Sequence, residues 1–303
     1  MSRTGPGDVR PVRHVSGRGV VVVGAEESSA HGEGPQESGR HRPIGDDMPV
    51  EEHWISVSDL QRRLAEKATE DPEHRFGGLY DLLSWETVLD EAGKRLLAHK
   101  GSRTPGLDRL DRRGLTENRD HHQARLLKQL REGTFQPNPV KRIYIPKKNG
   151  KMRPLGIPTL YDRWVQMAVK LILEPIFESD FLDFSHGFRP RRSCHTAIAH
   201  VVRLTTIRKR KVYWVIEGDI EGFLDHVHHK KLMSLLRRRI RDKQLLDLIW
   251  RFLRAGLMEQ GLFTRTKEGT PQGGVLSPLL ANIYLSRFDE WFGVPPFSWT
   301  GNG

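Results

Sequence analysis

Cysteine is almost absent from this 303-residue chain, and no apolar run is long enough to cross a membrane. The single cysteine, Cys194, cannot form a disulfide within the chain or build a cysteine-rich zinc site. A membrane helix needs about 20 consecutive apolar residues. The run Val20–Val23 is also too short for the core of a secretory signal. These absences predict a cytoplasmic protein of a reducing compartment, with no membrane partner.

Acidic side chains are the scarcer charged class. The chain has 38 Asp and Glu residues against 49 Lys and Arg, which gives a net charge of +11. A basic surface gains affinity for a polyanion because it releases counterions from the phosphates. The alternative is a basic surface that serves only solubility. The charge balance favours a nucleic acid partner.

The first 50 residues contain little that could form a core. They are rich in Gly, Arg, Ser, His and Pro, and their only apolar run is Val20–Val23. Burial of so little apolar surface cannot offset the entropy lost on ordering. We therefore predict a disordered tail over residues 1–50. Helical patterning begins only after Met48, so Met48 is an alternative to Met1 as the start of translation.

The rest of the chain combines several helical patterns with few strands. Apolar residues recur at helical spacing from Ser58 onward, over 85–100, before Gly133, over 161–177, over 242–257 and after Ser277. Two β-branched segments flank Asn149-Gly150, which predicts a hairpin over 139–158 with a basic tip. The run Val212–Ile216 predicts a buried strand that leads to Asp219. The pattern is typical of the α+β class.

Three segments carry most of the chemical information, and they occur in one order. They are Arg153–Pro158, Gly218–Asp225 and Gly269–Pro278. Together with Ser185–Pro190, they resemble the successive sequence blocks of reverse transcriptases encoded by bacterial group II introns. The resemblance covers roughly residues 54–292. Each block alone is a moderate signal, whereas the ordered set is specific.

The resemblance implies a helix-rich α+β fold with the fingers and a partial palm of a right-hand polymerase. Residues 51–211 would form an amino-terminal extension and the fingers, 212–292 the partial palm, and 293–303 an atypical tail. The implied function is RNA-templated DNA synthesis, with intron mobility and splicing assistance. The implied partners are intron RNA, an RNA template with a DNA primer, and deoxynucleoside triphosphates. The sequence leaves the oligomeric state open.

Asp219 is the candidate catalytic residue. Nucleotidyl transfer uses two magnesium ions, and hard oxygen ligands hold magnesium. The resemblance implies that Asp219 is an Mg²⁺ ligand and that the backbone carbonyl of Ile220 assists it. Asp225 lies six residues further on, and we expect a structural role for it rather than a second ligand position. The alternative for Asp219 is a carboxylate that merely caps a strand end.

Further residues match positions that contact the nucleotide in the family. Lys147, Lys148 and Arg153 would grip the triphosphate, since arginine can hold phosphate oxygens with two parallel hydrogen bonds. Which of the two lysines binds phosphate stays open, and a solvated hairpin tip is the alternative for both. Leu224 lies where the family usually has an aromatic residue that closes off the sugar 2′ position. Leucine makes a softer wall, and an ordinary core leucine is the other interpretation.

Gln272 and Gly273 match a pair that touches the nucleotide and lets the template strand come close, because glycine is needed where a backbone approaches a ligand. The competing interpretation is a simple turn. Arg189 is expected to position the template or primer backbone. Arg191 and Arg192 form a basic cluster suited to RNA phosphates, although such a cluster is often only a solvated face.

Three histidines, His226, His228 and His229, invite a zinc hypothesis. No carboxylate or cysteine companion lies at ligand spacing, so we expect surface residues instead.

The sequence contains no Tyr-Ala-Asp-Asp tetrad, which in the family supplies the remaining catalytic carboxylates. The only adjacent aspartates, Asp46 and Asp47, lie in the predicted tail. One carboxylate and one carbonyl cannot hold two magnesium ions. We therefore expect an amino-terminal fragment that is inactive alone unless a second polypeptide completes it. The alternatives are a non-catalytic module that binds intron RNA and a nonfunctional relic.

Overall fold

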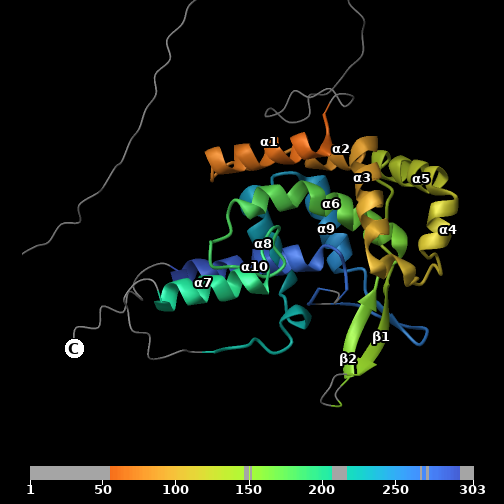
Figure 1. Cartoon of the computed structure of the whole chain (residues 1–303). Coiled ribbons are helices and arrows are strands. Elements are labelled where there is room, and N and C mark those ends of the chain that lie inside the picture. The colour runs from red at the N-terminus through yellow and green to blue at the C-terminus, as the bar shows by residue number, and fades with distance from the viewer. Residues whose placement is uncertain are drawn as a thin grey trace, which may run out of the picture. The chain divides into compact units, whose positions relative to one another are not determined.

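The architecture is a set of helices around one central helix, with a small mixed sheet at one side (Figure 1). The structure is a computed structural model that describes residues 55–146, 150, 152–206, 217–266, 268–270 and 273–293, all within the unit Arg42–Gly303. The predicted tail over 1–50, the predicted strand Val212–Ile216 and the segment 294–303 lie outside the described residues. Among the helices that are described, none is both long enough and apolar enough to cross a membrane.

The elements follow one another along the chain with a long helical stretch on each side of the first hairpin. The helices are α1 (Val57–Glu70), α2 (Leu79–Leu83), α3 (Glu86–Ala98), α4 (Arg112–Glu117), α5 (Arg119–Arg131), α6 (Leu160–Glu178), α7 (Cys194–Thr206), α8 (His229–Arg239), α9 (Lys243–Leu253) and α10 (Ser277–Gly293). Short 3₁₀ turns are η1 (Lys100–Arg103) and η2 (Phe223–Asp225). The strands are β1 (Val140–Pro146), β2 (Met152–Ile157), β3 (Leu257–Glu259) and β4 (Leu262–Thr264). The helix-rich α+β class is confirmed.

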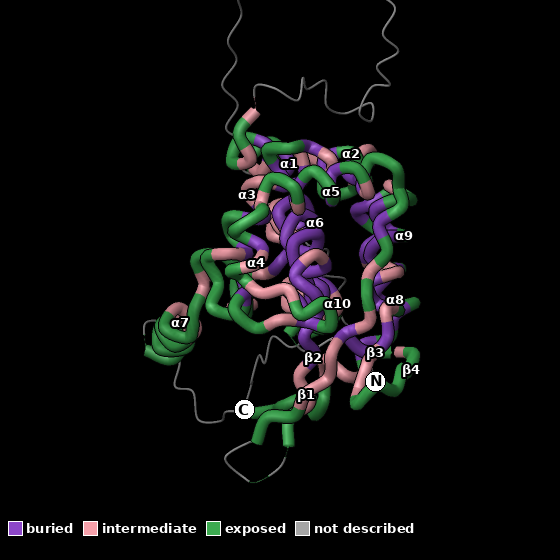
Figure 2. The backbone as a smooth tube through the Cα atoms, turned by 90° about the vertical axis from the view of Figure 1, so that its right-hand side faces the viewer, coloured by how far each residue is buried: buried purple, intermediate pink, exposed green. Residues whose placement is uncertain are grey.

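Helix α6 is the centre of the core, and Figure 2 shows it buried along most of its length. Its side chains are apolar on nearly every face, which is the pattern of a helix surrounded by protein. Trp164 is fully buried, and its indole donates a hydrogen bond of 2.6 Å to the carbonyl of Leu89 on α3. A Cβ on Gly93 would meet the Trp164 ring at 2.6 Å, so the glycine permits this close packing of α3 on α6.

The predicted hairpin is confirmed as β1 and β2, which pair antiparallel with Tyr144 opposite Pro154. Gly150 at its tip has φ +77°, the left-handed region that the Asn-Gly signal predicts. The strands are buried where they leave the core, at Val140 and Ile157, and become exposed towards the tip. The described parts of β1 and β2 therefore leave the core and become exposed towards Gly150.

A second hairpin, β3 and β4, completes a sheet of order β2-β1-β3-β4, in which β1 and β3 run parallel. The helix predicted over 242–257 ends earlier, at Leu253, and Leu257 begins β3. Gly256 has φ +81°, and its carbonyl accepts a hydrogen bond of 2.9 Å from the Val140 amide. This bond draws the chain out of the helix and into the sheet.

The start of α6 is fixed to the start of β1 by a buried carboxylate. The Asp162 side chain accepts hydrogen bonds from the Thr159 hydroxyl at 2.6 Å and from the Asn138 amide at 3.2 Å. Burial raises the pKa of Asp162 from 3.8 to about 6, because the charged form is poorly solvated. The hydrogen bonds oppose this rise, since they favour the charged form. The carboxylate holds the hairpin base against α6.

Candidate functional site

The segment that carries Asp219 turns sharply and meets the loop that begins at Gly269. Gly222 has φ +61° and leads into η2. The Thr270 amide donates a hydrogen bond of 2.7 Å to the Leu224 carbonyl, and the Gly269 amide donates one of 2.9 Å to the Val227 carbonyl. Gly269 has φ +88°, and a Cβ there would lie 2.7 Å from a backbone oxygen of η2. Only glycine fits where these two backbones touch.

A buried histidine supports the same loop. His229 is 3% exposed, and its Nε2 lies 2.7 Å from the Gly269 carbonyl, so Nε2 carries the proton that is donated. Burial lowers the pKa of His229 and keeps the ring neutral. The expectation of a surface position is wrong for His229, because its place in the first turn of α8 points it at this loop. No sequence signal distinguished it from its neighbours.

The other two histidines are at the surface as expected. His226 is exposed and lies 3.4 Å from the Glu268 carboxylate. His228 is exposed and caps α8, since its Nδ1 accepts a hydrogen bond of 3.3 Å from the Lys231 amide. Across the described ranges, no three acidic, histidine or cysteine side chains are grouped so that they could hold a metal ion.

The far end of the loop rests on β2. Gly273 has φ +115°, and a Cβ there would lie 2.4 Å from the Gly156 carbonyl of β2. Two residues later, the Val275 amide donates a hydrogen bond of 3.0 Å to the Gln166 side chain on α6. The structure thus gives Gly273 a packing reason for being glycine. The loop joins the Asp219 segment at one end to the hairpin at the other.

A cavity of about 210 Å³ lies where the three segments meet. The buried hydroxyl of Thr270 lines it and has no hydrogen-bond partner among the described residues. Its other walls come from the sheet, from η2 and from the loop, namely Arg142, Pro154, Gly156, Asp225, Leu257, Thr266, Glu268 and Gly269. The cavity shows that residues from all three sequence blocks face one space.

The predicted nucleotide and metal contacts are only partly within the described chain. Asp219 and Ile220 are exposed and lie in an irregular segment. Leu224 is half-buried, and Arg153 is exposed on β2 opposite Ile145. Lys147, Lys148 and Gln272 lie outside the described residues. The Leu224 carbonyl bonds to the Thr270 amide, and Gly273 lies against Gly156 of β2.

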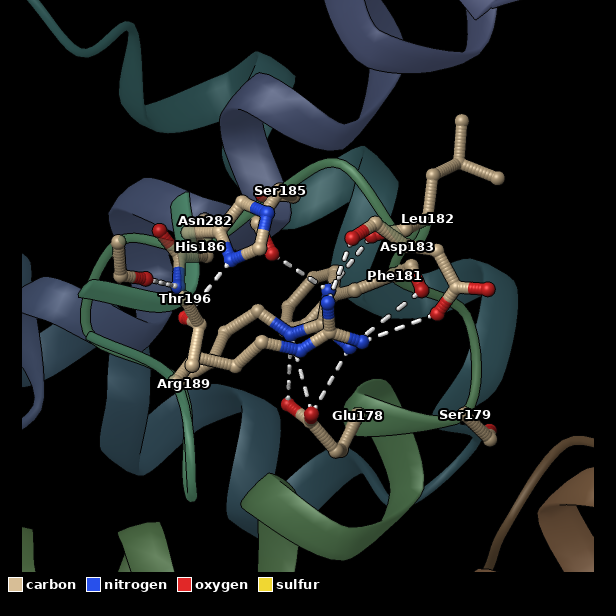
Figure 3. A network of polar contacts seen from close by, with 12 residues as sticks. Glu178, Ser179, Phe181, Leu182, Asp183, Ser185, His186, Arg189, Thr196 and Asn282 are labelled. Atoms are coloured by element: carbon tan, nitrogen blue, oxygen red, sulfur yellow. Dashed lines mark hydrogen bonds and ion pairs between the residues drawn. The ribbon is translucent and has the colours of Figure 1, made fainter. Parts of the chain in front are cut away.

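The structure places Arg189 inside the protein, where nucleic acid cannot reach its guanidinium (Figure 3). The side chain is 4% exposed and pairs with the Glu178 carboxylate at 2.8 Å. Nη1 donates to the carbonyls of Leu182 and Ser185 at 2.6 and 2.8 Å. The guanidinium also lies 5.3 Å from the ring centre of Phe181. Arg189 thus holds the loop that follows α6 in place. The sequence predicts a contact with the backbone of the template or primer instead.

The two neighbouring arginines remain nearer the surface. Arg192 donates to the Asp183 carboxylate at 2.9 Å and to its carbonyl at 2.5 Å, and its side chain is 24% exposed. Arg191 is exposed, with a left-handed φ of +57°. Arg191 is therefore the member of this cluster that is best placed for a phosphate contact.

The acidic residues at this site do not fit a complete two-magnesium centre. Two magnesium ions need several oxygen ligands held together. Asp219 is exposed and, within the described part of the chain, belongs to no group of three acidic, histidine or cysteine side chains that could hold a metal ion. The half-buried Asp225 and Arg142 line the same cavity, and the positive charge of Arg142 opposes cation binding there. Within the described residues, the acidic side chains do not form the ligand set that two magnesium ions need.

Replacing Gly273 with alanine should destabilise the loop, since a methyl group cannot occupy the position of the Gly156 carbonyl. We expect a loss of about 1–3 kcal/mol from the clash, in addition to about 1–2 kcal/mol for the left-handed backbone. Gly261→Ala is the matched control, because Gly261 has φ +84° but no neighbour within 4 Å of its Cβ position. Urea unfolding compares the two, and equal losses would show that Gly273 does not pack on β2.

Comparisons with known proteins show which proteins this chain is similar to. Residues 145–294 match the family described as reverse transcriptase (RNA-dependent DNA polymerase). Protein YkfC of Escherichia coli is 46% identical over 236 residues, which cover 78% of this chain and 62% of YkfC. The group II intron-encoded protein LtrA of Lactococcus lactis is 42% identical over 237 residues, 77% of this chain and 38% of LtrA.

Among solved structures, a partial Cas6-RT-Cas1–Cas2 complex aligns with a TM-score of 0.46 at 24% identity, over 71% of this chain and 35% of that one. The chain spans less than two thirds of the length of the two curated relatives. The matched residues include all three sequence blocks that converge on the cavity. The chain belongs to the reverse transcriptase family, and group II intron-encoded proteins are among its relatives.

Proposed function

We propose that this chain forms the substrate-positioning part of a group II intron reverse transcriptase, which synthesises DNA on an RNA template and assists intron mobility and splicing. Residues 51–211 would form the extension and fingers, and 212–292 the beginning of the palm. The single observation that supports this most strongly is the junction at Gly269 and Gly273, where one loop packs on both η2 and β2. If the three sequence blocks resembled the family by chance, there would be no reason for them to contact one another in the fold.

The proposed substrates are a deoxynucleoside triphosphate and an RNA template paired with a DNA primer. Arg153 and one of Lys147 and Lys148 would hold the triphosphate, and the exposed position of Arg153 on β2 supports this role for the arginine. Gln272 and Leu224 would contact the nucleotide, with Leu224 as the soft wall beside the sugar. Its half-buried side chain and its bonded carbonyl support a fixed position for that wall.

Divalent metal ions are a general requirement of reverse transcriptases in this family. We propose that the metal is Mg²⁺ and that Asp219 and the Ile220 carbonyl would contribute ligands. The ions would supply charge stabilisation for the transferred phosphate. The remaining carboxylates are not among these 303 residues, which contain no Tyr-Ala-Asp-Asp tetrad. The proposed cellular site is the bacterial cytoplasm, where intron RNA is made.

A primer-extension assay tests the proposal. Residues 55–293 would replace the matching segment of a longer group II intron reverse transcriptase. We expect this chimera to extend a DNA primer on an RNA template in magnesium, and the 303-residue chain alone to make no product. A folded chimera without activity would contradict the proposal and favour a non-catalytic RNA-binding role. Processive synthesis by the chain alone would show that its ligand set is complete.

A further inference from the structure

A groove between α8 and α9 has features that the proposed activity does not use. It has a volume of about 420 Å³ and is lined by one face of each helix. Lys230, Met233 and Arg237 line it from α8, and Lys243, Leu246, Asp247 and Trp250 line it from α9. These positions are spaced by three, four and seven residues, which places them on one side of each helix. The volume is in the range of about 300–1,000 Å³ that ligand sites usually have.

The rim of the groove is positively charged without compensation. Lys230, Arg237 and Lys243 are exposed, and none has a carboxylate partner among the described residues. The one acid in the groove, Asp247, is already paired with Arg251 at 3.1 Å. An uncompensated set of cations around one concave surface attracts anions.

The contrast with the adjacent arginines shows that this charge is not a general property of α8. Arg238 pairs with Glu290 at 3.7 Å, and Arg239 pairs with Asp180 at 3.3 Å. Arg237 is next to both in sequence and has no such partner in the part of the chain that the structure describes. Arg238 and Arg239 therefore form ion pairs within the fold, whereas Arg237, which lines the groove, forms none among the described residues.

The two lysines occupy positions that do not favour the helices themselves. Lys230 lies in the first turn of α8, and Lys243 begins α9; neither helix has an acidic residue in its first turn. The helix macrodipole is positive at that end and disfavours a cation there. Lysine at these two positions therefore does not stabilise the helices. Its positive charge does attract anions to the groove.

The floor of the groove is apolar and fixed. Met233 is 2% exposed and Leu246 is 6% exposed, so the surrounding protein holds both side chains in place. Trp250 is half-buried and held by the guanidinium of Arg254, which lies 5.5 Å from the ring centre. Cations around an apolar, partly aromatic floor are what a single-stranded nucleic acid needs, because phosphates and base faces are bound at once.

We propose that the α8–α9 groove binds a single-stranded stretch of nucleic acid, with phosphates on Lys230, Arg237 and Lys243 and a base over the apolar floor. The seven residues from Lys230 to Arg237 span about 10 Å of helix, so cations lie at both ends of the floor. A peptide of Asp and Glu alone lacks a flat apolar group between its charges, and a duplex keeps its bases stacked inside. The groove shares no lining residue with the cavity beside Gly269.

Fluorescence anisotropy of a labelled oligouridylate, titrated with the full 303-residue chain at several salt concentrations, tests the proposal. The groove variant is Lys230→Glu, Arg237→Glu and Lys243→Glu. The matched control is Arg63→Glu, Lys100→Glu and Lys231→Glu, three exposed cations outside the groove with the same total change of charge. All six positions are at the surface, so both variants are expected to fold, and circular dichroism checks this.

We expect the groove variant to lose affinity at least about ten-fold relative to the control, with a salt dependence shallower by about 2 in log–log slope for three lost phosphate contacts. Trp250→Ala should lose roughly ten-fold, and Trp250→Phe should retain most of the affinity. Equal losses in groove and control variants would overturn the proposal, as would equal competition by polyglutamate or equally tight groove-dependent binding of a duplex. This outcome is independent of primer extension, which tests the proposed function separately.

Discussion

Replacing Arg189 with alanine should lower the free energy of unfolding by about 3–5 kcal/mol, the usual cost of removing one partner from a buried ion pair. The change would leave the Glu178 carboxylate without its cation and the carbonyls of Leu182 and Ser185 without their donor. Unpaired polar groups at a buried position cost the full loss of their hydration. Urea unfolding measures the effect, with far-ultraviolet circular dichroism as the signal.

Arg191→Ala is the matched control for this prediction. Arg191 is exposed and has no ion-pair partner among the described residues, so its removal should change stability by less than about 0.5 kcal/mol. The pair of variants also separates structure from nucleic acid binding. If Arg189→Ala left stability unchanged and only weakened binding to RNA, the burial of Arg189 and its contacts in Figure 3 would be contradicted.

Helices with one apolar stripe and a hairpin with an Asn-Gly turn could be predicted from the sequence. In α1, the buried positions are Leu60, Leu64 and Ala68, which are the residues whose spacing predicted the helix. In the first hairpin, Gly150 has the positive φ that the turn signal requires. In both cases the local pattern and the tertiary packing demand the same structure, so a local signal is sufficient.

Elements that depend on distant partners could not be predicted. Strands β3 and β4 have three residues each, too few to show an alternating pattern, and β3 exists because it pairs with β1. Helix α7 was not predicted, although Ile198, Val201 and Val202 recur at helical spacing, and none of its residues is buried in the structure. Helix α9 ends at Leu253 for a tertiary reason, since the Gly256 carbonyl bonds to β1.

The candidate site shows the same division. Sequence blocks could identify which segments matter, and their convergence on one cavity agrees with that choice. They could not assign Arg189 to the interior, because a buried arginine and an exposed one look alike in a Gly-Phe-Arg-Pro segment. They could not assign His229 to the support of Gly269, because the partner is a backbone carbonyl 40 residues away. Thr270 carries no sequence signal for its buried, unpaired hydroxyl.

Replacing Asp219 with asparagine should remove DNA synthesis from the chimera, with a loss on the order of 10³-fold, which is typical of a preorganised electrostatic contact that is lost. Asparagine has nearly the same shape but no negative charge, so it cannot neutralise a divalent cation. Asp219 is exposed in the structure, and its replacement therefore should not alter folding. Any loss of activity would therefore come from the missing negative charge and not from a change in the structure.

Primer extension by the chimera with Asp219→Asn, compared with the same chimera carrying Glu221→Gln, tests whether the Asp219 carboxylate is needed for DNA synthesis. Glu221 is an exposed acid two residues away, so its replacement removes the same charge from the same segment. We expect that Asp219→Asn abolishes synthesis and that Glu221→Gln retains it, while both proteins unfold at the same urea concentration. Full activity of the Asp219→Asn chimera, or equal loss in both, would contradict this expectation.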